Sequence, residues 1–150
     1  MKIKIIYTSL TGNTQEAVEV LSDALTAKKI EVETFDSEDG IEVADFFTEA
    51  DAYVLATFTD EDGVVPDGII DFYDDIADFD LTEVPIAVLG TGDTSYVDFC
   101  RAVELLAEQC QASGAQITVP LLKIELAPEA EDVAAIEKFA EQLTQQVVAR

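Results

Sequence analysis

The feature that most constrains the fold of this chain is a repeated alternation of apolar runs with amphipathic helical patterns. Five runs rich in β-branched residues have the length of strands, and after each one apolar residues recur every three or four positions. Apolar runs of this kind are typical of parallel strands that are covered on both faces. The sequence therefore predicts an α/β fold, a doubly wound five-stranded parallel sheet with helices on both faces. The expected strands are 2–7, 30–35, 52–57, 85–90 and 115–124, the last broken near Pro120, and the expected helices are 13–28, 41–47, one starting near Pro66, 98–113 and 129–148.

Composition narrows the classes of function. A chain of 150 residues suits one domain, residues 1–150. The formal net charge is −24, and no Lys or Arg occurs from Ile30 to Cys100, where 21 of the 32 acidic residues lie. Such a surface repels nucleic acid and anionic membranes and attracts basic proteins. Histidine is absent, which removes the usual zinc and haem ligands and the His-dependent hydrolases.

The remaining bulk features predict a small intracellular protein. No apolar run reaches the length of a membrane span, and the N-terminus lacks the features of a secretory signal, so we expect a cytoplasmic location. We also expect a monomer. Cys100 and Cys110 show no metal-ligand spacing, and we expect both thiols to be buried and unreactive.

The segment between the first strand and the first helix is rich in hydroxyl groups. It reads Thr8-Ser9-Leu10-Thr11-Gly12-Asn13-Thr14. Unpaired amides at a helix start favour an anion, and the glycine lets the backbone approach a ligand. The segment has no Lys or Arg, so only neutral donors would hold a phosphate, unlike the lysine-containing loop of nucleoside triphosphatases or the three-glycine dinucleotide fingerprint. The alternative is an ordinary helix start capped by Ser or Thr.

This loop resembles the flavodoxin phosphate loop, which is rich in Ser and Thr around Thr-Gly-Asn-Thr. A second segment, Gly90-Thr91-Gly92-Asp93-Thr94-Ser95-Tyr96 followed by Asp98-Phe99-Cys100, is similar to the flavodoxin loop that grips one face of the flavin. The tail Leu122-Lys123-Ile124-Glu125 is also similar, and the lack of an inserted lobe resembles the short-chain class. The resemblance implies strand order 2-1-3-4-5, an FMN cofactor, and a low-potential carrier that shuttles electrons between a reductase and acceptor enzymes without substrate turnover of its own.

The resemblance also implies which residues contact FMN. The loop from Ser9 to Thr14 would hold the phosphate, with Leu10 contributing only its amide. Tyr96 would stack on the outer face of the isoalloxazine, and Gly92 and Asp93 would approach its pyrimidine edge through backbone groups. The full expected set is Ser9, Leu10, Thr11, Gly12, Asn13, Thr14, Thr57, Phe58, Thr59, Asp60, Glu61, Thr91, Gly92, Asp93, Tyr96, Phe99 and Cys100.

The loop after the third strand departs from the family pattern. Family members carry Thr, an aromatic, Thr and then Trp-Gly-Asp, whereas this chain reads Thr57-Phe58-Thr59-Asp60-Glu61-Asp62-Gly63. Asp60 replaces the Trp that covers the inner flavin face, and Glu61 replaces the Gly whose peptide flips toward the reduced flavin. We therefore expect a more exposed FMN and a less stabilised semiquinone. A shifted register, in which Asp62-Gly63 supplies the flipping peptide and Phe58 gives part of the aromatic cover, is the alternative.

Two other functions are compatible with these residues. One is an FMN reductase of flavodoxin fold, against which the chain offers no substrate domain, no nicotinamide motif and no histidine as general acid. The other is a flavodoxin-like module with weakened or lost FMN binding, which Asp60 favours. A receiver domain shares the architecture but needs an acidic pair after the first strand, where Tyr7-Thr8-Ser9 stands instead.

Overall fold

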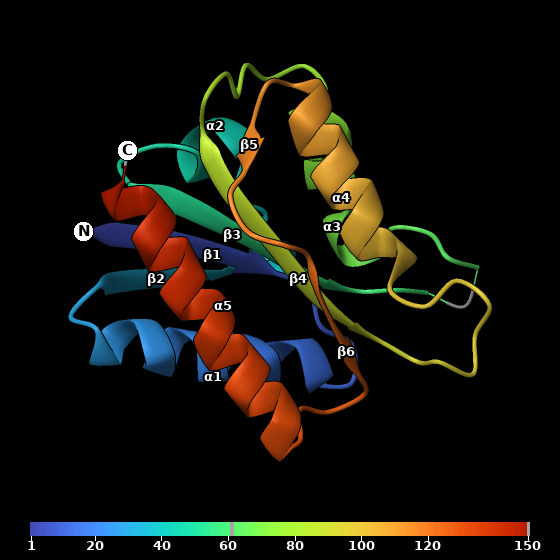
Figure 1. Cartoon of the computed structure of the whole chain (residues 1–150). Helices are drawn as coiled ribbons and strands as arrows, with labels where there is room; N and C mark the ends of the chain where they lie inside the picture. The colour runs from blue at the N-terminus through green and yellow to red at the C-terminus, as the bar shows by residue number, and fades with distance from the viewer. Residues whose placement is uncertain (61, 150) are drawn as a thin grey trace.

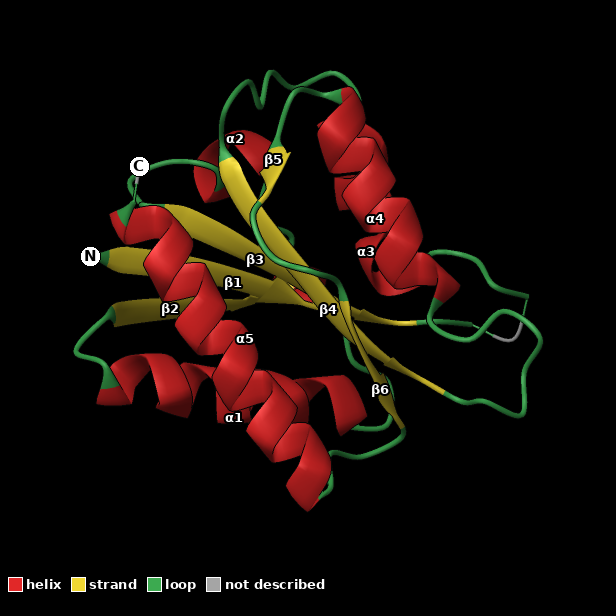
Figure 2. Ribbon diagram, in the orientation of Figure 1, coloured by secondary structure: helices red, strands yellow, loops and turns green. Residues whose placement is uncertain are grey.

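Over the described residues, 1–60 and 62–149, the computed structural model contains one six-stranded sheet between two layers of helices (Figures 1 and 2). All strand pairs are parallel, and the order is β2-β1-β3-β4-β5, with β6 also pairing with β4. This order confirms the expected topology. The strands are β1 Lys2–Tyr7, β2 Glu31–Asp36, β3 Ala52–Phe58, β4 Pro85–Gly92, β5 Gln116–Ile117 and β6 Leu122–Glu125.

Helices cover both faces of the sheet. They are α1 Asn13–Ala27, the 3-10 turn η1 Ser37–Asp39, α2 Val43–Phe46, α3 Asp67–Ile76, α4 Arg101–Ala112 and α5 Ala130–Val148. Helices α1 and α5 pack on one face, and α2, α3 and α4 pack on the other, each over its own cluster of buried apolar side chains (Figure 1). Within the described ranges, no helix has both the length and the apolar character that crossing a bilayer would require.

The last strand is divided where the sequence places a proline. Residues 118–121 separate β5 from β6, and both segments pair with β4. Pro120 has no amide hydrogen to donate to a ladder, so the strand is interrupted there and resumes at Leu122. The expected break is confirmed, although the expected fifth strand is counted as two strands.

Helix α4 begins later than the sequence predicts. The expected helix starts at residue 98, but α4 starts at Arg101. Cys100 has a φ of 54°, in the left-handed region, and a helix cannot continue through that conformation. Phe99 and Cys100 therefore belong to the loop after β4, and this lengthens the segment that reaches the carboxyl end of the sheet.

Candidate functional site

A cleft of about 250 Å³ lies at the carboxyl ends of β1, β3 and β4. Three loops build most of it, the one before α1, the one after β3 and the one after β4, and a residue directly after β6 completes the lining. Carboxyl ends of parallel strands share one edge of a sheet, so these sequence-distant loops meet there. The residues that line the cleft are Ser9, Leu10, Thr11, Asn13, Thr14, Phe58, Thr59, Asp60, Thr91, Gly92, Asp93, Tyr96 and Leu126.

Helix α1 offers unpaired amides to this cleft. The Ser9 hydroxyl oxygen accepts hydrogen bonds from the amides of Gly12, at 3.1 Å, and Gln15, at 3.3 Å. Gly12 has a φ of 95°, and apart from its two chain neighbours no described residue has an atom within 4 Å of the place where a Cβ would stand. Three more amides have no acceptor within the described part of the chain: Thr11, Asn13 and Thr14. Ser9 thus caps part of the helix start, and the remaining donors are available to an anion.

A buried pair of hydroxyls ties this loop to the middle of the sheet. The Oγ1 atoms of Thr14 and Thr91 are 2.8 Å apart, and both side chains are buried. Each hydroxyl has one donor hydrogen and two acceptor lone pairs, so the pair is satisfied and keeps further capacity toward a ligand. The contact fixes the first turn of α1 against the end of β4.

The loop after β3 contributes Phe58, Thr59 and Asp60 to the cleft. Thr57 was expected in the site, but its side chain is fully buried and its hydroxyl donates to the carbonyl of Phe58 at 2.7 Å, outside the cleft lining. The Thr59 hydroxyl accepts from the amide of Ala102 at 3.0 Å. The structure therefore places Thr57 within the sheet and Thr59 between the cleft and α4.

The next residues show where the loop has backbone freedom. Glu61, which the sequence places among the cofactor contacts, lies outside the described residues. Gly63 has a φ of 71°, and its amide donates to the carbonyl of Asp60 at 2.9 Å. Glycine adopts such a φ at no steric cost, so this geometry is compatible with the shifted register, in which Asp62-Gly63 is the flexible peptide.

The loop after β4 presents Asp93 and Tyr96. A hydrogen bond from the amide of Ser95 to the carboxylate lowers the pKa of Asp93 below its usual value. The amide of Tyr96 donates to the carbonyl of Asp93 at 3.0 Å, which closes a turn, and the Tyr96 side chain is 38% exposed at the cleft. A tyrosine held in this way offers a ring face to a planar ligand.

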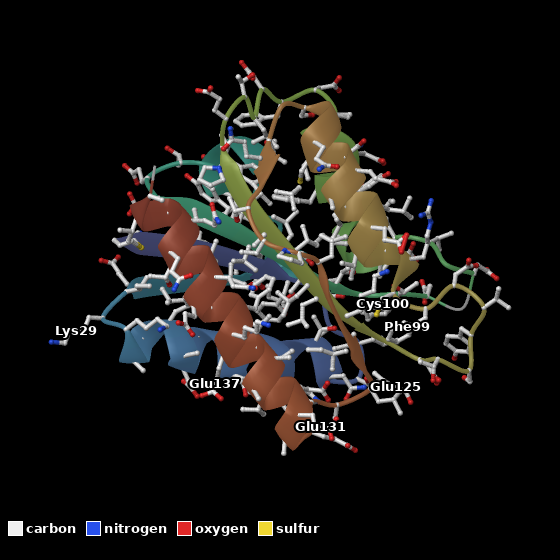
Figure 3. All side chains as sticks on the ribbon, viewed as in Figure 1. Lys29, Phe99, Cys100, Glu125, Glu131 and Glu137 are labelled. Atoms are coloured by element: carbon white, nitrogen blue, oxygen red, sulfur yellow. The ribbon has the colours of Figure 1, made fainter. Side chains whose placement is uncertain are left out.

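Phe99 and Cys100 lie behind the cleft rather than in it, although the resemblance places them in the site. Figure 3 labels both at the start of α4. A Cβ added to Gly92 would stand 2.8 Å from the Cys100 sulfur and 3.3 Å from the Phe99 ring, so these side chains pack directly under β4. Both cysteines are free and buried, as expected, and burial raises the pKa of Cys100 to about 11. Such a thiol stays protonated and unreactive at neutral pH.

Leu126 lines the cleft and was missed by the sequence reasoning. It has a φ of 55°, its side chain is 48% exposed, and its amide donates to the carbonyl of Gly92 at 2.8 Å. The indication available in the sequence was its position one residue after β6, an apolar residue at the edge where the other site loops lie. Because the last strand is interrupted, its sequence pattern did not show where the strand ends, and Leu126 was not recognised as a residue at that edge.

The charges around the cleft determine which ligand it can hold. Among the described residues, the lining contains two carboxylates, Asp60 and Asp93, and no Lys or Arg. An anion would therefore be bound by amides and hydroxyls at the α1 end, and a ring would lie among Tyr96, Phe58 and Leu126. The described lining includes no paired nucleophile and base, so this arrangement supports binding of a phosphate-bearing planar group rather than hydrolysis.

Comparison with known proteins gives one consistent family. The family model described as Flavodoxin matches residues 5–144. The chain is 34% identical to "Probable flavodoxin 2" of Bacillus subtilis over 141 residues, 94% of this chain and 93% of that protein. It is 33% identical to "Flavodoxin" of Maridesulfovibrio salexigens, covering 89% of this chain and 92% of the other. The crystal structure of oxidised Flavodoxin 2 from Bacillus cereus superposes with a TM-score of 0.92 at 35% identity, over 97% of this chain and 99% of that one.

Proposed function

This chain belongs to the flavodoxin family, whose members bind FMN and carry electrons, and we propose that the cleft at the ends of β1, β3 and β4 is where it holds FMN. The single observation that carries the proposal is the set of unpaired amides at the start of α1, which shares one cleft with Tyr96. Bound FMN supplies reversible electron transfer, and the protein sets its position and its access to partners.

The residues of the cleft fit both halves of FMN. The phosphate would be held by the amides of Thr11, Asn13 and Thr14 with hydroxyls of the same loop, because a helix N-terminus favours a dianion even where no Lys or Arg is present. The isoalloxazine would lie against the Tyr96 ring, with Phe58 and Leu126 giving apolar contact elsewhere. Leu10, 77% exposed, would contribute its amide.

Asp60 stands at the cleft where the family pattern has a Trp, and its carboxylate would not stack on the ring. Negative charge from Asp60 and Asp93 disfavours further negative charge on a nearby flavin, so the potential for adding the last electron would be low. We propose that these acidic loops, together with the other acidic residues between positions 30 and 100, guide basic reductases and acceptor enzymes toward the flavin edge.

The test is a fluorescence titration of FMN with flavin-free protein, run beside riboflavin. The proposal expects FMN fluorescence to be quenched stoichiometrically and riboflavin, which lacks the phosphate, to bind at least about a hundredfold more weakly. Full retention of FMN fluorescence with excess folded protein would refute FMN binding. Oxidation of NADPH by the purified FMN complex alone would instead identify a reductase.

A further inference from the structure

Helix α4 starts without a cap of its own. Its N-cap residue, Cys100, is in the left-handed conformation, and its side chain makes no capping hydrogen bond. The first amides of a helix have no intrahelical acceptor, and buried ones require an acceptor from elsewhere. Ala102, in this first turn, is fully buried, and its amide donates to the Thr59 hydroxyl at 3.0 Å. Its cap is therefore supplied by a side chain 43 positions earlier in the sequence.

Thr59 lies in the loop after β3, which lines the cleft. Helix α4 follows directly after the loop that comes after β4, which also lines the cleft. The Thr59 side chain is 8% exposed and lines the cleft between Phe58 and Asp60. The helix it caps begins directly after the 93–100 loop that carries Tyr96. The hydrogen bond from Ala102 to Thr59 therefore joins the loop after β3 to the loop after β4.

One contact reinforces this junction, and a second holds the 93–100 loop against β4. A Cβ on Gly63 would stand 2.7 Å from Cβ of Asp98, so the loop after β3 packs against the loop after β4. A Cβ on Gly92 would stand 2.8 Å from the Cys100 sulfur, so the 93–100 loop folds back under β4. In Figure 1 the two loops extend side by side from the same end of the sheet.

We propose that Thr59 is a positioning residue whose hydroxyl, by accepting the hydrogen bond from the Ala102 amide, holds the two flavin-facing loops in one arrangement, so that they receive FMN as a unit. The inference rests on the proposed function, because it concerns how the cleft is prepared for FMN. Without the bond, the loops would occupy the binding arrangement for a smaller fraction of the time. The apparent affinity for FMN falls in proportion to the fraction of time spent in the binding arrangement. Association slows accordingly, while dissociation of the formed complex is nearly unchanged.

The experiment compares Thr59→Val, which keeps the shape and removes the acceptor, with Thr59→Ser, which keeps the hydroxyl. Stopped-flow fluorescence measures FMN association and dissociation with each flavin-free full-length protein. We expect Thr59→Val to associate about fivefold more slowly, the change that corresponds to loss of one helix cap, with dissociation altered less than twofold. Thr59→Ser should keep wild-type rates. Ile136→Val, buried on α5 across the sheet, is the control for a general loss of stability.

The outcomes separate this inference from the proposed function. Failure of the wild-type protein to bind FMN overturns both. Normal association of Thr59→Val overturns the inference alone, as does a loss seen only in dissociation, which would make Thr59 a direct contact. An equal defect in Thr59→Ser or in Ile136→Val also overturns it.

If Thr59→Val does not fold, hydrogen exchange of the wild-type protein decides the question. Ala102 does not line the cleft, so FMN has no direct contact through which to protect its amide. The proposal expects saturating FMN to slow exchange at Ala102 by the same factor as in the 93–98 loop. An Ala102 amide that exchanges at the same rate with and without FMN overturns it.

Discussion

The side chains that line the cleft divide into partly exposed ones, which offer contact surface to a ligand, and buried ones, whose hydrogen bonds hold the loops. Tyr96 and Leu126 present partly exposed apolar surface to the cleft, whereas Thr14, Thr59 and Thr91 are buried and hydrogen-bonded. Removing a residue of the first group should change ligand affinity and leave the fold intact. Removing one of the second group should change the arrangement of the loops.

Replacing Tyr96 with Leu tests the first group. An aromatic stack adds about 1 kcal/mol beyond the burial of area, so we expect FMN to bind about fivefold more weakly, while Tyr96→Phe stays near wild type. Fluorescence titration gives the dissociation constants. Val97→Ala is the matched control, because Val97 is the next residue, is 98% exposed and does not line the cleft. Wild-type affinity in Tyr96→Leu would show that the ring is not stacked on the flavin.

At the scale of elements, two contacts place α4 relative to the sheet. Gly90 in β4 lies against the Thr57 carbonyl and the Val103 side chain, with no space for a Cβ. The next residue of the same helix, Glu104, accepts ion-paired hydrogen bonds from Arg101 at 2.8 Å and from Lys123 of β6 at 2.6 Å. The first contact sets how closely β3, β4 and α4 approach, and the second links α4 to β6.

Gly90→Ala should be strongly destabilising. Its methyl group would overlap the Thr57 carbonyl and Val103, and a backbone carbonyl cannot move aside as a side chain can. We expect a loss of about 3 kcal/mol in the free energy of unfolding, measured in urea on flavin-free protein. Adding Val103→Ala should relieve only part of the overlap, because the Thr57 carbonyl remains. The double variant should therefore have a lower free energy of unfolding than Val103→Ala alone. A Gly90→Ala protein within about 0.5 kcal/mol of wild type would contradict the packing.

Glu104→Gln should have an effect that depends on pH. Hydrogen bonds from Lys123 and Arg101 lower the pKa of Glu104, so its carboxylate stabilises the folded state above the unfolded pKa and loses that effect as pH falls through the depressed value. Since water screens the two ion pairs of Glu104, we expect Glu104→Gln to lower the free energy of unfolding by only about 0.5 kcal/mol at pH 7. This loss should vanish in acid. Chemical unfolding at several pH values measures it. Glu137→Gln, an exposed glutamate on α5, removes the same charge and should show no such loss.

For the whole molecule, repulsion outweighs local pairing. Among the described residues, ion pairs involve Lys2, Arg101 and Lys123, whereas the chain carries 32 acidic residues and a net charge of −24. Salt weakens both the few pairs and the many repulsions, and the repulsions are far more numerous. Unbalanced charge of one sign destabilises a compact state, so screening it should stabilise the fold.

Raising NaCl from 10 to 500 mM should therefore increase the melting temperature of the flavin-free protein by about 3 °C, since about 1 kcal/mol corresponds to about 2–4 °C in a domain of this size. Scanning calorimetry measures the shift. Choline chloride at the same ionic strength should give the same rise, because the cause is screening. A fall in melting temperature with salt would show that the ion pairs dominate instead.

The sequence by itself determined the order and type of the elements and which loops would meet. Apolar runs and period-3.6 patterns are local, so the strands and the α-helices could be predicted from their own residues, as could the Pro120 break, whereas η1 was not predicted. The site loops followed from the rule that parallel strands end at one edge, and Tyr96 and Ser9 to Thr14 do lie in one cleft. The start of α4 was wrong because the left-handed backbone at Cys100 has no local sequence cause.

Only the tertiary structure decided which polar groups are free and which are engaged. Thr57 and Thr59 belong to the same short motif, yet one hydroxyl bonds the adjacent carbonyl inside the sheet and the other caps a helix 43 residues away. Leu126 joined the cleft through the hydrogen bond that its amide donates to the Gly92 carbonyl. Such partners are chosen by packing between distant segments, and no periodicity along the chain encodes the distance between two loops once the sheet has folded.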